Sequence, residues 1–304
     1  MISKIINDTA KDIKDLKIQG ASKIELSAIN AILEYIKSSN LEKDKFIGEL
    51  IENINYLIKQ RPNEPKLRNS LNFVLKKSYR HNSNLERQKL INEISAYEEY
   101  TEKCNKKVSE IASKLITNDM NILTHCHSNL VEDALKAAYD NGIKFKVYNT
   151  ETRPKYQGRI TSKNLCDYGI DTTQIVDSAV THVLKKCDIF LSGADVVFSD
   201  GAIMNKVGTY GISILAKAFK TEHIVITTTH CCELDLLLNV NEPVEQRDDD
   251  EVWAENERPK NLKILNPSFD IIPEEYISRF ITEEGVFSAE GLSLWVNKVK
   301  SKYF

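Results

Sequence analysis

From Asp119 onward, the chain alternates short apolar, β-branched runs with amphipathic segments, and this alternation limits the folds open to it. The pattern predicts strands at 121–125, 144–149, 173–177, 188–192 and 223–228, and helices at 129–141, 161–168, 179–186 and 209–221. Such alternation is typical of βαβ units, whose parallel strands form a sheet with helices on both faces. No predicted strand is followed by Gly-x-Gly-x-x-Gly. We therefore expect a Rossmann-like α/β fold, mostly parallel, without the usual dinucleotide fingerprint.

Residues 1–117 carry a different pattern, that of consecutive amphipathic helices. An apolar stripe at three- and four-residue spacing is formed by Phe46, Leu50, Ile51, Ile54, Leu57 and Ile58. We therefore predict a helical N-terminal domain at 1–117 and a Rossmann-like α/β domain at 118–304. Gly20 is one of only two glycines in the helical part. It is either an ordinary helix break or a place where the backbone approaches a ligand closely.

Composition argues against several classes of protein. The net charge of −3 at pH 7 gives no overall basic surface for nucleic acid. The six cysteines include no CxxC pair, which suits a reducing compartment better than a disulfide framework. The N-terminal segment lacks the apolar core of a signal peptide, and no apolar run approaches the ~20 residues of a membrane span. We expect a cytoplasmic protein that binds neither nucleic acid nor membranes.

The segment 242–260 interrupts the alternation with an acidic run, EPVEQRDDDEVWAENERPK. A charge-rich segment between regular elements is typical of a solvated surface loop. A lid over a site and a loop that docks a partner are the alternatives.

The stretch NILTHCHS, residues 121–128, places Cys126 between a buried strand and the start of a helix. Asn129 and Glu132, three residues apart, match a capping pair for that helix. Backbone N–H groups and the helix dipole at such a position favour thiolate. The polar residues on either side argue for an accessible thiol rather than a buried structural cysteine. A metal site is the third alternative, although consecutive His-Cys-His residues do not easily direct three side chains at one ion.

Polar residues also follow other predicted strands, at the edge where ligands of parallel sheets bind. They lie in ETRP at 151–154, SGAD at 192–195 and GAIMNKVGT at 201–209. SGAD places Asp195 at the same edge as Cys126, and the last segment offers backbone N–H groups, an amide and a cation to an anion. Arg61 and Arg68 supply positive charge from the helical part. Together, these residues predict a rim with a thiol, a carboxylate and several groups suited to phosphate.

These segments resemble a family that joins archaeal ribose-1,5-bisphosphate isomerase, methylthioribose-1-phosphate isomerase and the regulatory subunits of translation initiation factor 2B. The resemblance covers nearly the whole chain through IQGA, RPNEPKLRN, THCHS, ETRPKYQGR, SGAD, DGAIMNKVGT, NPSFDIIP and ITEEG, in that order. Enzymes of the family carry a cysteine in THCHS and an aspartate in SGAD, a pair that the regulatory subunits commonly lack. This chain keeps both, as Cys126 and Asp195. RPNEPKLRN and NPSFDIIP look more like the ribose-bisphosphate branch.

The resemblance implies an aldose–ketose isomerase that converts ribose 1,5-bisphosphate to ribulose 1,5-bisphosphate in AMP or nucleoside salvage, with neither metal nor redox cofactor. It implies Cys126 as the base and Asp195 as the acid. The residues that it assigns to the phosphosugar substrate are Gln19, Gly20, Ala21, Ser22, Arg61, Ser128, Asn129, Arg153, Asn205 and Lys206. It also implies a homo-oligomer, either a dimer or an assembly of dimers. The alternatives are a non-catalytic regulatory subunit that senses a phosphorylated ligand, and a methylthioribose-1-phosphate isomerase.

Two positions depart from the pattern of the enzymes. Gln19 stands where the ribose-bisphosphate branch usually has arginine, and His230-Cys231-Cys232 stands where the enzymes tend to carry lysine. Loss of one charge-assisted contact to phosphate costs ~1.5–3 kcal/mol. The cations that would compensate are Arg61, Arg153 and Lys206. Asp270, in NPSFDIIP, is expected either to orient sugar hydroxyls or to brace a loop.

Overall fold

The computed structural model describes residues 2–15, 17–18, 20–61, 64–80, 87–233, 244–288, 291–292 and 294–295. The chain forms two compact units, unit 1 at Met1–Cys104 and unit 2 at Asn105–Lys302. The division between the units falls inside helix α5 (Arg87–Ser113). The domain division at residue 117, which follows the end of the helical sequence pattern, lies just beyond this helix and stays a prediction.

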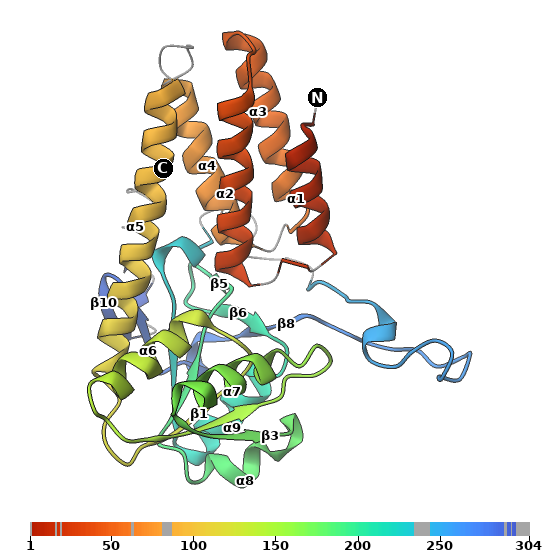
Figure 1. Ribbon diagram of the computed structural model, residues 1–304. Coiled ribbons are helices and arrows are strands. Elements are labelled where there is room, and N and C mark those ends of the chain that lie inside the picture. Colours follow the sequence, from red (N-terminus) through yellow and green to blue (C-terminus); the bar gives the residue numbers. More distant parts are fainter. Residues whose placement is uncertain are drawn as a thin grey trace. The chain divides into compact units, whose positions relative to one another are not determined.

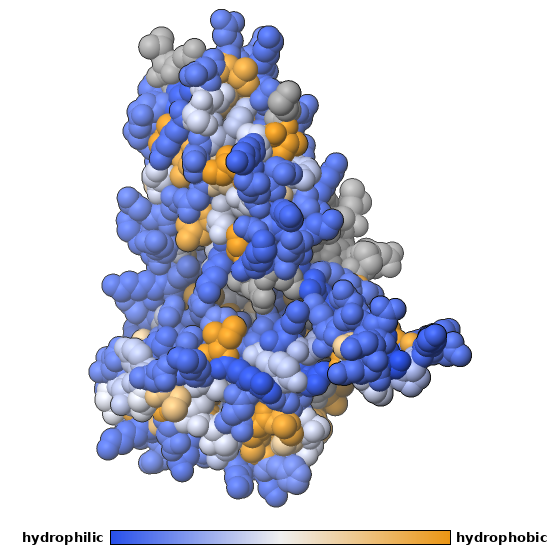
Figure 2. Space-filling view, turned by 45° about the vertical axis from the view of Figure 1, so that its right-hand side comes forward, coloured by the Kyte–Doolittle hydropathy of each residue, from blue (hydrophilic) through white to orange (hydrophobic). Residues whose placement is uncertain are grey.

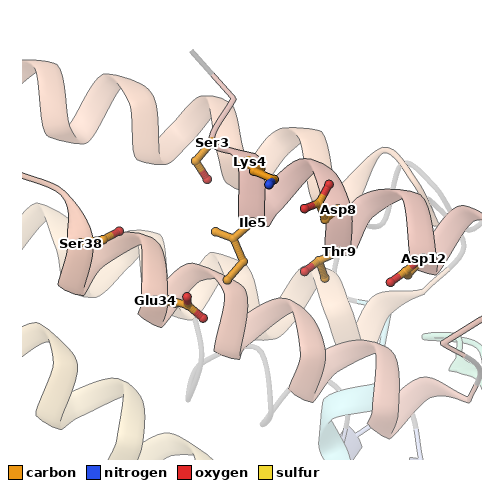
Figure 3. A pocket seen from close by; sticks show the side chains of 8 residues that line it. All are labelled: Ser3, Lys4, Ile5, Asp8, Thr9, Asp12, Glu34 and Ser38. Atoms are coloured by element: carbon orange, nitrogen blue, oxygen red, sulfur yellow. The ribbon is translucent and has the colours of Figure 1, made fainter.

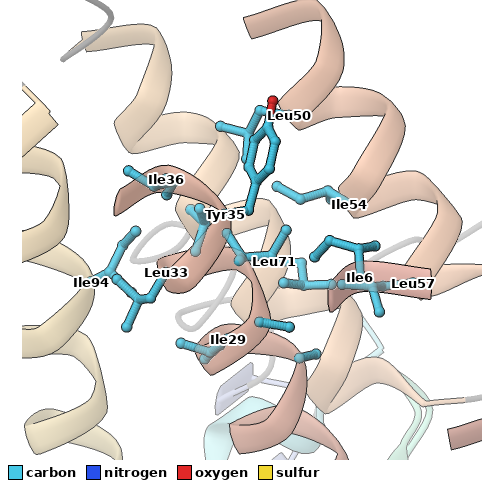
Figure 4. Packing of buried hydrophobic residues seen from close by; sticks show 14 of the residues in the cluster. Ile6, Ile29, Leu33, Tyr35, Ile36, Leu50, Ile54, Leu57, Leu71 and Ile94 are labelled. Carbon is cyan, nitrogen blue, oxygen red and sulfur yellow. The ribbon is translucent and has the colours of Figure 1, made fainter. Parts of the chain in front are cut away.

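Unit 1 is built from amphipathic helices, as its sequence pattern predicts. They are α1 (Lys4–Lys14), α2 (Ala21–Ser38), α3 (Lys43–Ile58), α4 (Pro65–Arg80) and the first part of α5 (Figure 1). Their apolar stripes meet in one cluster, which Figure 4 shows with residues from different helices, among them Ile6, Ile29, Leu71 and Ile94. The predicted stripe on α3 is confirmed, because its most buried members are Phe46, Leu50, Ile54 and Leu57.

Unit 2 contains a seven-stranded sheet with the order β10-β9-β7-β4-β1-β2-β3. The strands are β1 (Asn121–Thr124), β2 (Lys146–Thr150), β3 (Asp171–Ile175), β4 (Ile189–Ser192), β7 (Glu222–Ile226), β9 (Arg279–Thr282) and β10 (Gly285–Ser288). All neighbours pair in parallel except β9 and β10, which are antiparallel at one edge. The five strands predicted from the sequence are confirmed, with small shifts at their ends.

Helices cover both faces of this sheet. They are α6 (Asn129–Asp140), α7 (Gln157–Tyr168), α8 (Val180–Leu184) and α9 (Thr209–Phe219), and short 3₁₀ turns occur at Asp177–Ala179, Thr229–Cys231, Asp249–Glu251 and Glu274–Tyr276. Successive residues of a strand point to opposite faces. Accordingly, Ile122 of β1 packs with residues of α6 and α7, whereas Leu123 packs with residues of α8 and α9. This arrangement confirms the predicted fold class.

The structure also contains a second, smaller sheet that the sequence pattern does not predict. Its strands are β5 (Val196–Val197), β6 (Ile203–Lys206) and β8 (Phe269–Ile272), each antiparallel to its neighbour. β5 has only two residues, and β8 lies far along the chain from β6, so neither strand gives a periodic signal. This sheet matters for the site because β6 carries Asn205 and Lys206.

The segment 244–267 extends from unit 2 as a long loop (Figure 1). It agrees with the surface loop predicted for the acidic run, of which residues 242–243 lie outside the described residues. Ion pairs order the loop internally, since Arg247 pairs with both Glu245 and Glu251. The charges of the acidic run are therefore partly neutralised within the loop itself.

The face of the molecule drawn in Figure 2 is mostly polar. On the face drawn in Figure 2, hydrophilic residues predominate and hydrophobic residues form small, separate groups. Among the described residues, no helix combines the length and the apolar character needed to cross a membrane.

Gly158, the second residue of α7, lies where this helix packs closely against the end of β2. A Cβ atom at Gly158 would lie 1.8 Å from the backbone oxygen of Thr150. Because backbone atoms cannot move aside cheaply, we expect Gly158→Ala to lower the free energy of unfolding by ~2 kcal/mol or more. The matched control is Gly211→Ala in α9, where an added Cβ meets nothing within 4 Å. That change should leave stability unchanged or raise it by up to ~1 kcal/mol, and urea unfolding measures both.

Candidate active site

The carboxyl ends of three neighbouring parallel strands bring several predicted segments together. β1 lies between β2 and β4 and pairs with both in parallel. The loops that follow β1, β2 and β4 carry Cys126, Arg153 and Asp195, respectively. The first and last of these loops pack closely, because a Cβ on Gly193 would lie 2.9 Å from the Ser128 hydroxyl oxygen. The three loops therefore share one edge of the sheet.

Cys126 has a left-handed backbone conformation, with φ of 68°. Its backbone N–H donates to the hydroxyl of Thr152 over 3.0 Å, and Thr152 is itself left-handed, with φ of 60°. The Cys126 thiol donates to Oε1 of Gln157 over 3.7 Å, and its carbonyl accepts from the Thr161 hydroxyl over 3.1 Å. Cys126 is only 8% exposed. The accessible thiol expected from its polar neighbours is therefore buried, because α7 and the loop after β2 contact it.

Burial raises the pKa of the Cys126 thiol to about 11. The Lys206 ammonium and the His127 backbone N–H lower this pKa, while the carboxylates of Asp195 and Asp177 add to the increase. Lys206 and Asp195 thus lie near enough to the thiol to act on it electrostatically. The expectation that the start of the next helix favours thiolate is wrong here, because loss of hydration outweighs the favourable charges.

The cap of α6 differs from the predicted pair of Asn129 and Glu132. Ser128 is the N-cap, and its hydroxyl accepts from the Val131 N–H over 3.5 Å. Asn129 is the first helical residue and is exposed. The Glu132 carboxylate lies 2.8 Å from Nδ1 of His127 instead of closing a capping box. The start of this helix, with its N–H groups, nevertheless follows Cys126 directly.

Arg153 lies in a loop that is held through both its backbone and its side chain. The backbone N–H groups of Thr152 and Arg153 donate to the two carboxylate oxygens of Asp177, each over 2.7 Å. The Arg153 guanidinium donates to the Tyr156 hydroxyl and the Val252 carbonyl, each over 3.0 Å. These bonds fix an exposed positive charge in the loop after β2.

β6 supplies an amide and a second cation. The buried Asn205 side chain donates to the Thr209 hydroxyl over 3.2 Å. The Lys206 ammonium lies 4.9 Å from the centre of the Phe269 ring. Asp270 accepts two backbone N–H bonds at the start of α9, of 2.8 and 3.0 Å. Of the two roles expected for Asp270, the structure shows that of a brace.

His125 received no role from the sequence, although it precedes Cys126 in THCHS. Its Nδ1 lies 2.6 Å from the Thr150 hydroxyl oxygen, and its Nε2 lies 2.9 Å from the Val207 carbonyl oxygen. Burial lowers the pKa of the His125 imidazole, so the ring is neutral at pH 7. A Cβ on Gly208 would lie 3.0 Å from this ring. The only local sequence signal is a polar residue directly after an apolar strand.

Several predicted substrate residues belong to unit 1. Gly20 has φ of 87° and precedes α2, which starts at Ala21. Arg61 follows α3 and is partly buried, and Gln19 lies outside the described residues. The part of these residues in substrate binding stays a prediction.

Lys66, within RPNEPKLRN, is a cation of unit 1 that sequence reasoning overlooked. It is only 1% exposed, and its ammonium donates to the hydroxyl of Ser22 over 2.8 Å. It also pairs with the buried Glu25 over 3.4 Å. Ser22, one of the predicted substrate residues, is therefore held by a buried ion pair near the start of α2.

Unit 1 also has an open groove, which Figure 3 shows beside α1 and α2. Its volume is about 500 Å³, and it is lined by Ser3, Lys4, Ile5, Asp8, Thr9, Asp12, Glu34 and Ser38. None of these residues belongs to the sequence motifs described above. In the part of the chain that the structure describes, no group of three or more His, Cys, Asp or Glu side chains is arranged to hold a metal ion.

The Initiation factor 2 subunit family matches residues 17–289, and the chain belongs to this family. It is 35% identical to ribose 1,5-bisphosphate isomerase of Methanocaldococcus jannaschii over 301 residues, which cover 99% of this chain and 96% of that protein. It is 32% identical to methylthioribose-1-phosphate isomerase of Caldicellulosiruptor saccharolyticus, over 90% and 85% of the two chains. Translation initiation factor eIF-2B of Pyrococcus horikoshii OT3 has a TM-score of 0.83 at 23% identity, covering 94% and 98%. That likeness supports the fold alone.

The raised pKa of Cys126 predicts how its thiol reacts with iodoacetamide. Only the thiolate reacts, and the pKa is about 11 in the folded chain. The alkylation rate should therefore rise about tenfold for each pH unit, with no plateau below about pH 10. In urea, the rate should level off near the ordinary value of 9.0. Mass spectrometry of the Cys126 peptide measures this rate, and a plateau near neutral pH in the folded protein would contradict the effect of burial.

Proposed function

We propose that this protein is an aldose–ketose isomerase that converts ribose 1,5-bisphosphate to ribulose 1,5-bisphosphate. The observation that carries the proposal is the Cys126 thiol under the influence of Asp195 and Lys206, at the carboxyl edge of a parallel sheet. The isomerases to which the chain is similar, over 99% and 90% of its length, support this class of reaction. Isomerisation between adjacent carbons needs one group that moves a proton on carbon and one that moves protons on oxygen. A thiol and a carboxyl can divide these tasks.

In the first step, the Cys126 thiolate removes the proton from C2 of the sugar. The electron pair of that C–H bond forms a double bond between C1 and C2, and the bond from C1 to the ring oxygen breaks. Asp195, which is protonated at this stage, gives its proton to the departing ring oxygen. The result is an open-chain enol phosphate, with Cys126 as a thiol and Asp195 as a carboxylate.

In the second step, protons move between different atoms of the substrate. The Asp195 carboxylate takes the proton of the hydroxyl on C2, which becomes the ketone. The Cys126 thiol gives its proton to C1, which becomes a CH₂ group that still carries its phosphate. Both side chains return to their starting states, and no electrons leave the substrate.

The starting state requires a proton on Asp195 and a negative charge on Cys126. In the chain itself, burial favours the thiol form of Cys126. Transfer of one proton from the thiol to the carboxylate gives the required state without changing the total charge. A phosphate dianion beside Asp195 would favour this transfer, because a nearby negative charge raises the pKa of a carboxyl. Lys206 stabilises the thiolate that remains.

We assign the phosphate groups to cations and N–H groups at the same edge of the sheet. Helix N-termini bind anions through unpaired N–H groups, and Ser128 and Asn129 begin α6. The side chains that would complete the site are Arg153, Asn205 and Lys206. Gly20, Ala21, Ser22 and Arg61 remain predicted contacts, and Gln19 remains a predicted contact without a structural description.

We place the reaction in AMP or nucleoside salvage, which releases ribose phosphates, and in the cytoplasm. The six cysteines include no CxxC pair, which suits a reducing compartment. We further propose that the protein acts as a homo-oligomer, either a dimer or an assembly of dimers. Size-exclusion chromatography with light scattering tests the oligomeric state directly.

A regulatory subunit that binds a phosphorylated ligand without turnover is the second candidate function. The observation in its favour is the raised pKa of Cys126, since a thiol that stays protonated is not a base. A methylthioribose 1-phosphate substrate is supported by the 32% identical relative. A coupled assay with both sugar phosphates separates these functions.

Substitution of the two proposed catalytic residues tests the chemistry. Cys126→Ser replaces a thiol by a much weaker acid, and Asp195→Asn removes the group that carries protons between oxygens. We expect each to lower kcat by at least ~100-fold, the usual contribution of general acid–base catalysis. The matched controls are Cys166→Ser on α7 and Asp200→Asn, both at exposed positions. Retention of activity by either catalytic variant, or an equal loss in its control, would overturn that assignment.

Binding of the substrate phosphate is tested by thermal unfolding. Millimolar ribose 1,5-bisphosphate should raise the melting temperature, because a ligand that binds only the folded state stabilises it. Lys206→Ala should reduce this shift, since it removes a cation from the site. Lys217→Ala is a matched control, because Lys217 also lies over an aromatic ring, 4.7 Å from the centre of Tyr276. A shift without turnover would favour the regulatory function, and an equal shift in Lys206→Ala would exclude Lys206 from the phosphate site.

A further inference from the structure

A line of hydrogen bonds joins the backbone of Cys126 to the neighbouring His125 side chain. The Cys126 N–H lies 3.0 Å from the Thr152 hydroxyl oxygen, which lies 3.3 Å from the Thr150 hydroxyl oxygen. Thr150 in turn lies 2.6 Å from Nδ1 of His125, and Nε2 lies 2.9 Å from the Val207 carbonyl. These four bonds are buried or partly buried. Apart from Val207, all of these residues belong to β2 or to the loops that follow β1 and β2.

The two ends of this line fix the direction of every proton in it. The Val207 carbonyl can only accept, so Nε2 of His125 carries the hydrogen and Nδ1 must accept from the Thr150 hydroxyl. At the other end, the Cys126 N–H can only donate to Thr152. Because the single hydrogen of the Thr150 hydroxyl is used on Nδ1, the Thr152 hydroxyl donates to Thr150. The line has one consistent arrangement, in which the His125 imidazole is neutral and lies between Thr150 and Val207.

The charges around the ring do not disturb this arrangement. Burial is the largest influence on His125 and lowers the pKa of its imidazole. Asp177 and Asp270 raise this pKa and Lys206 lowers it, so charged groups on three other segments act on the ring together with burial. The neutral ring suits the Nδ1 acceptor role that the hydrogen bonds require.

The hydrogen bonds of this line hold two residues, Cys126 and Thr152, in an unfavourable backbone conformation. Left-handed backbone is unfavourable at a residue other than glycine, and both Cys126 and Thr152 have it. Their mutual hydrogen bond holds the two strained residues against each other. At the far end, His125 binds the residue that follows Lys206. The His125 imidazole therefore links three segments. They are the loop after β1, which carries the thiol, the end of β2 with the loop after it, and the end of β6, which carries the Lys206 cation.

We propose that His125 is a positioning residue that sets the placement of the Cys126 thiol through Thr150 and Thr152. It does not exchange protons with the substrate, because both of its ring nitrogens are already engaged. The consequence for catalysis rests on the proposed function, whereas the placement of the thiol does not. His125 thus adds a residue to the site that contacts neither the substrate nor the thiol itself.

Thr150→Val tests the proposal, because it removes the hydroxyl at the middle of the line and keeps the side-chain shape. Loosening of Cys126 should expose its thiol and speed its alkylation by about fivefold at fixed pH, the factor for one net hydrogen bond. If the protein is an isomerase, kcat should fall by a similar or larger factor with little change in KM. Thr150→Ser restores the hydroxyl and should restore both values.

Ser213→Ala is the matched control. Ser213 also lies beside a buried histidine, 3.0 Å from Nδ1 of His223, but its hydroxyl donates to the Thr209 carbonyl and it belongs to α9. This control should lower stability to a comparable degree without changing the alkylation rate of Cys126. Alkylation is followed on the Cys126 peptide, so the exposed Cys166 does not interfere.

The outcomes separate the two proposals. An unchanged alkylation rate in Thr150→Val, with an ordinary loss of stability, would overturn the positioning role whatever the activity. A faster rate in Thr150→Val but not in Ser213→Ala would support the positioning role even if no isomerase activity is found. If Thr150→Val does not fold, Thr152→Val breaks the next bond of the line and carries the same expectations.

Discussion

The candidate site depends on the parallel pairing of β1 with both β2 and β4. Parallel strands end at the same edge of a sheet, so three loops far apart in sequence must meet there. That edge receives Cys126 from one loop, Arg153 from the second and Asp195 from the third. Helices on both faces bury most residues of these three strands, which makes a shift in register costly. The packing of the strands therefore determines where the side chains of these loops lie relative to one another.

Burial has two opposing effects at Cys126. It excludes water from a thiol that would act on a carbon-bound proton, and it also raises the pKa of that thiol to about 11. The local rule that a helix start favours thiolate fails because the whole environment, and not one dipole, determines hydration. Nearby charges act on this pKa in addition to burial, with Lys206 lowering it and Asp195 raising it. A ligand that changes the charge beside these groups would change the ionisation of the thiol, which links binding to chemistry.

The alternation of apolar runs was sufficient to predict five of the parallel strands and most of the helices of unit 2, whereas β9, which also pairs in parallel, was not predicted. The smaller sheet could not be predicted, since β6 pairs with β8 across a long stretch of chain. The same limit applies to His125, whose partners Thr150 and Val207 are 25 and 82 residues away. Local patterns predicted the segments of the candidate site, but the hydrogen bonds of single residues such as His125 are formed between distant segments. The predicted helix cap erred by one residue for a simpler reason, because Ser128 and Asn129 are both good caps.

The acidic loop contacts the loop after β2 through groups that its composition only partly indicates. Some of its charges pair within the loop, where Arg247 binds both Glu245 and Glu251. It contacts the loop after β2 in two ways: Glu251 pairs with Lys155 over 3.1 Å, and the Val252 carbonyl accepts from the Arg153 guanidinium. Every residue type carries such a carbonyl, so no sequence pattern marks the second contact. A guanidinium has five N–H donors, and in Arg153 one of them binds Tyr156 and another binds Val252. The loop can thus hold Arg153 in place while leaving it able to bind a phosphate, and a cation held in advance loses less entropy when the ligand arrives.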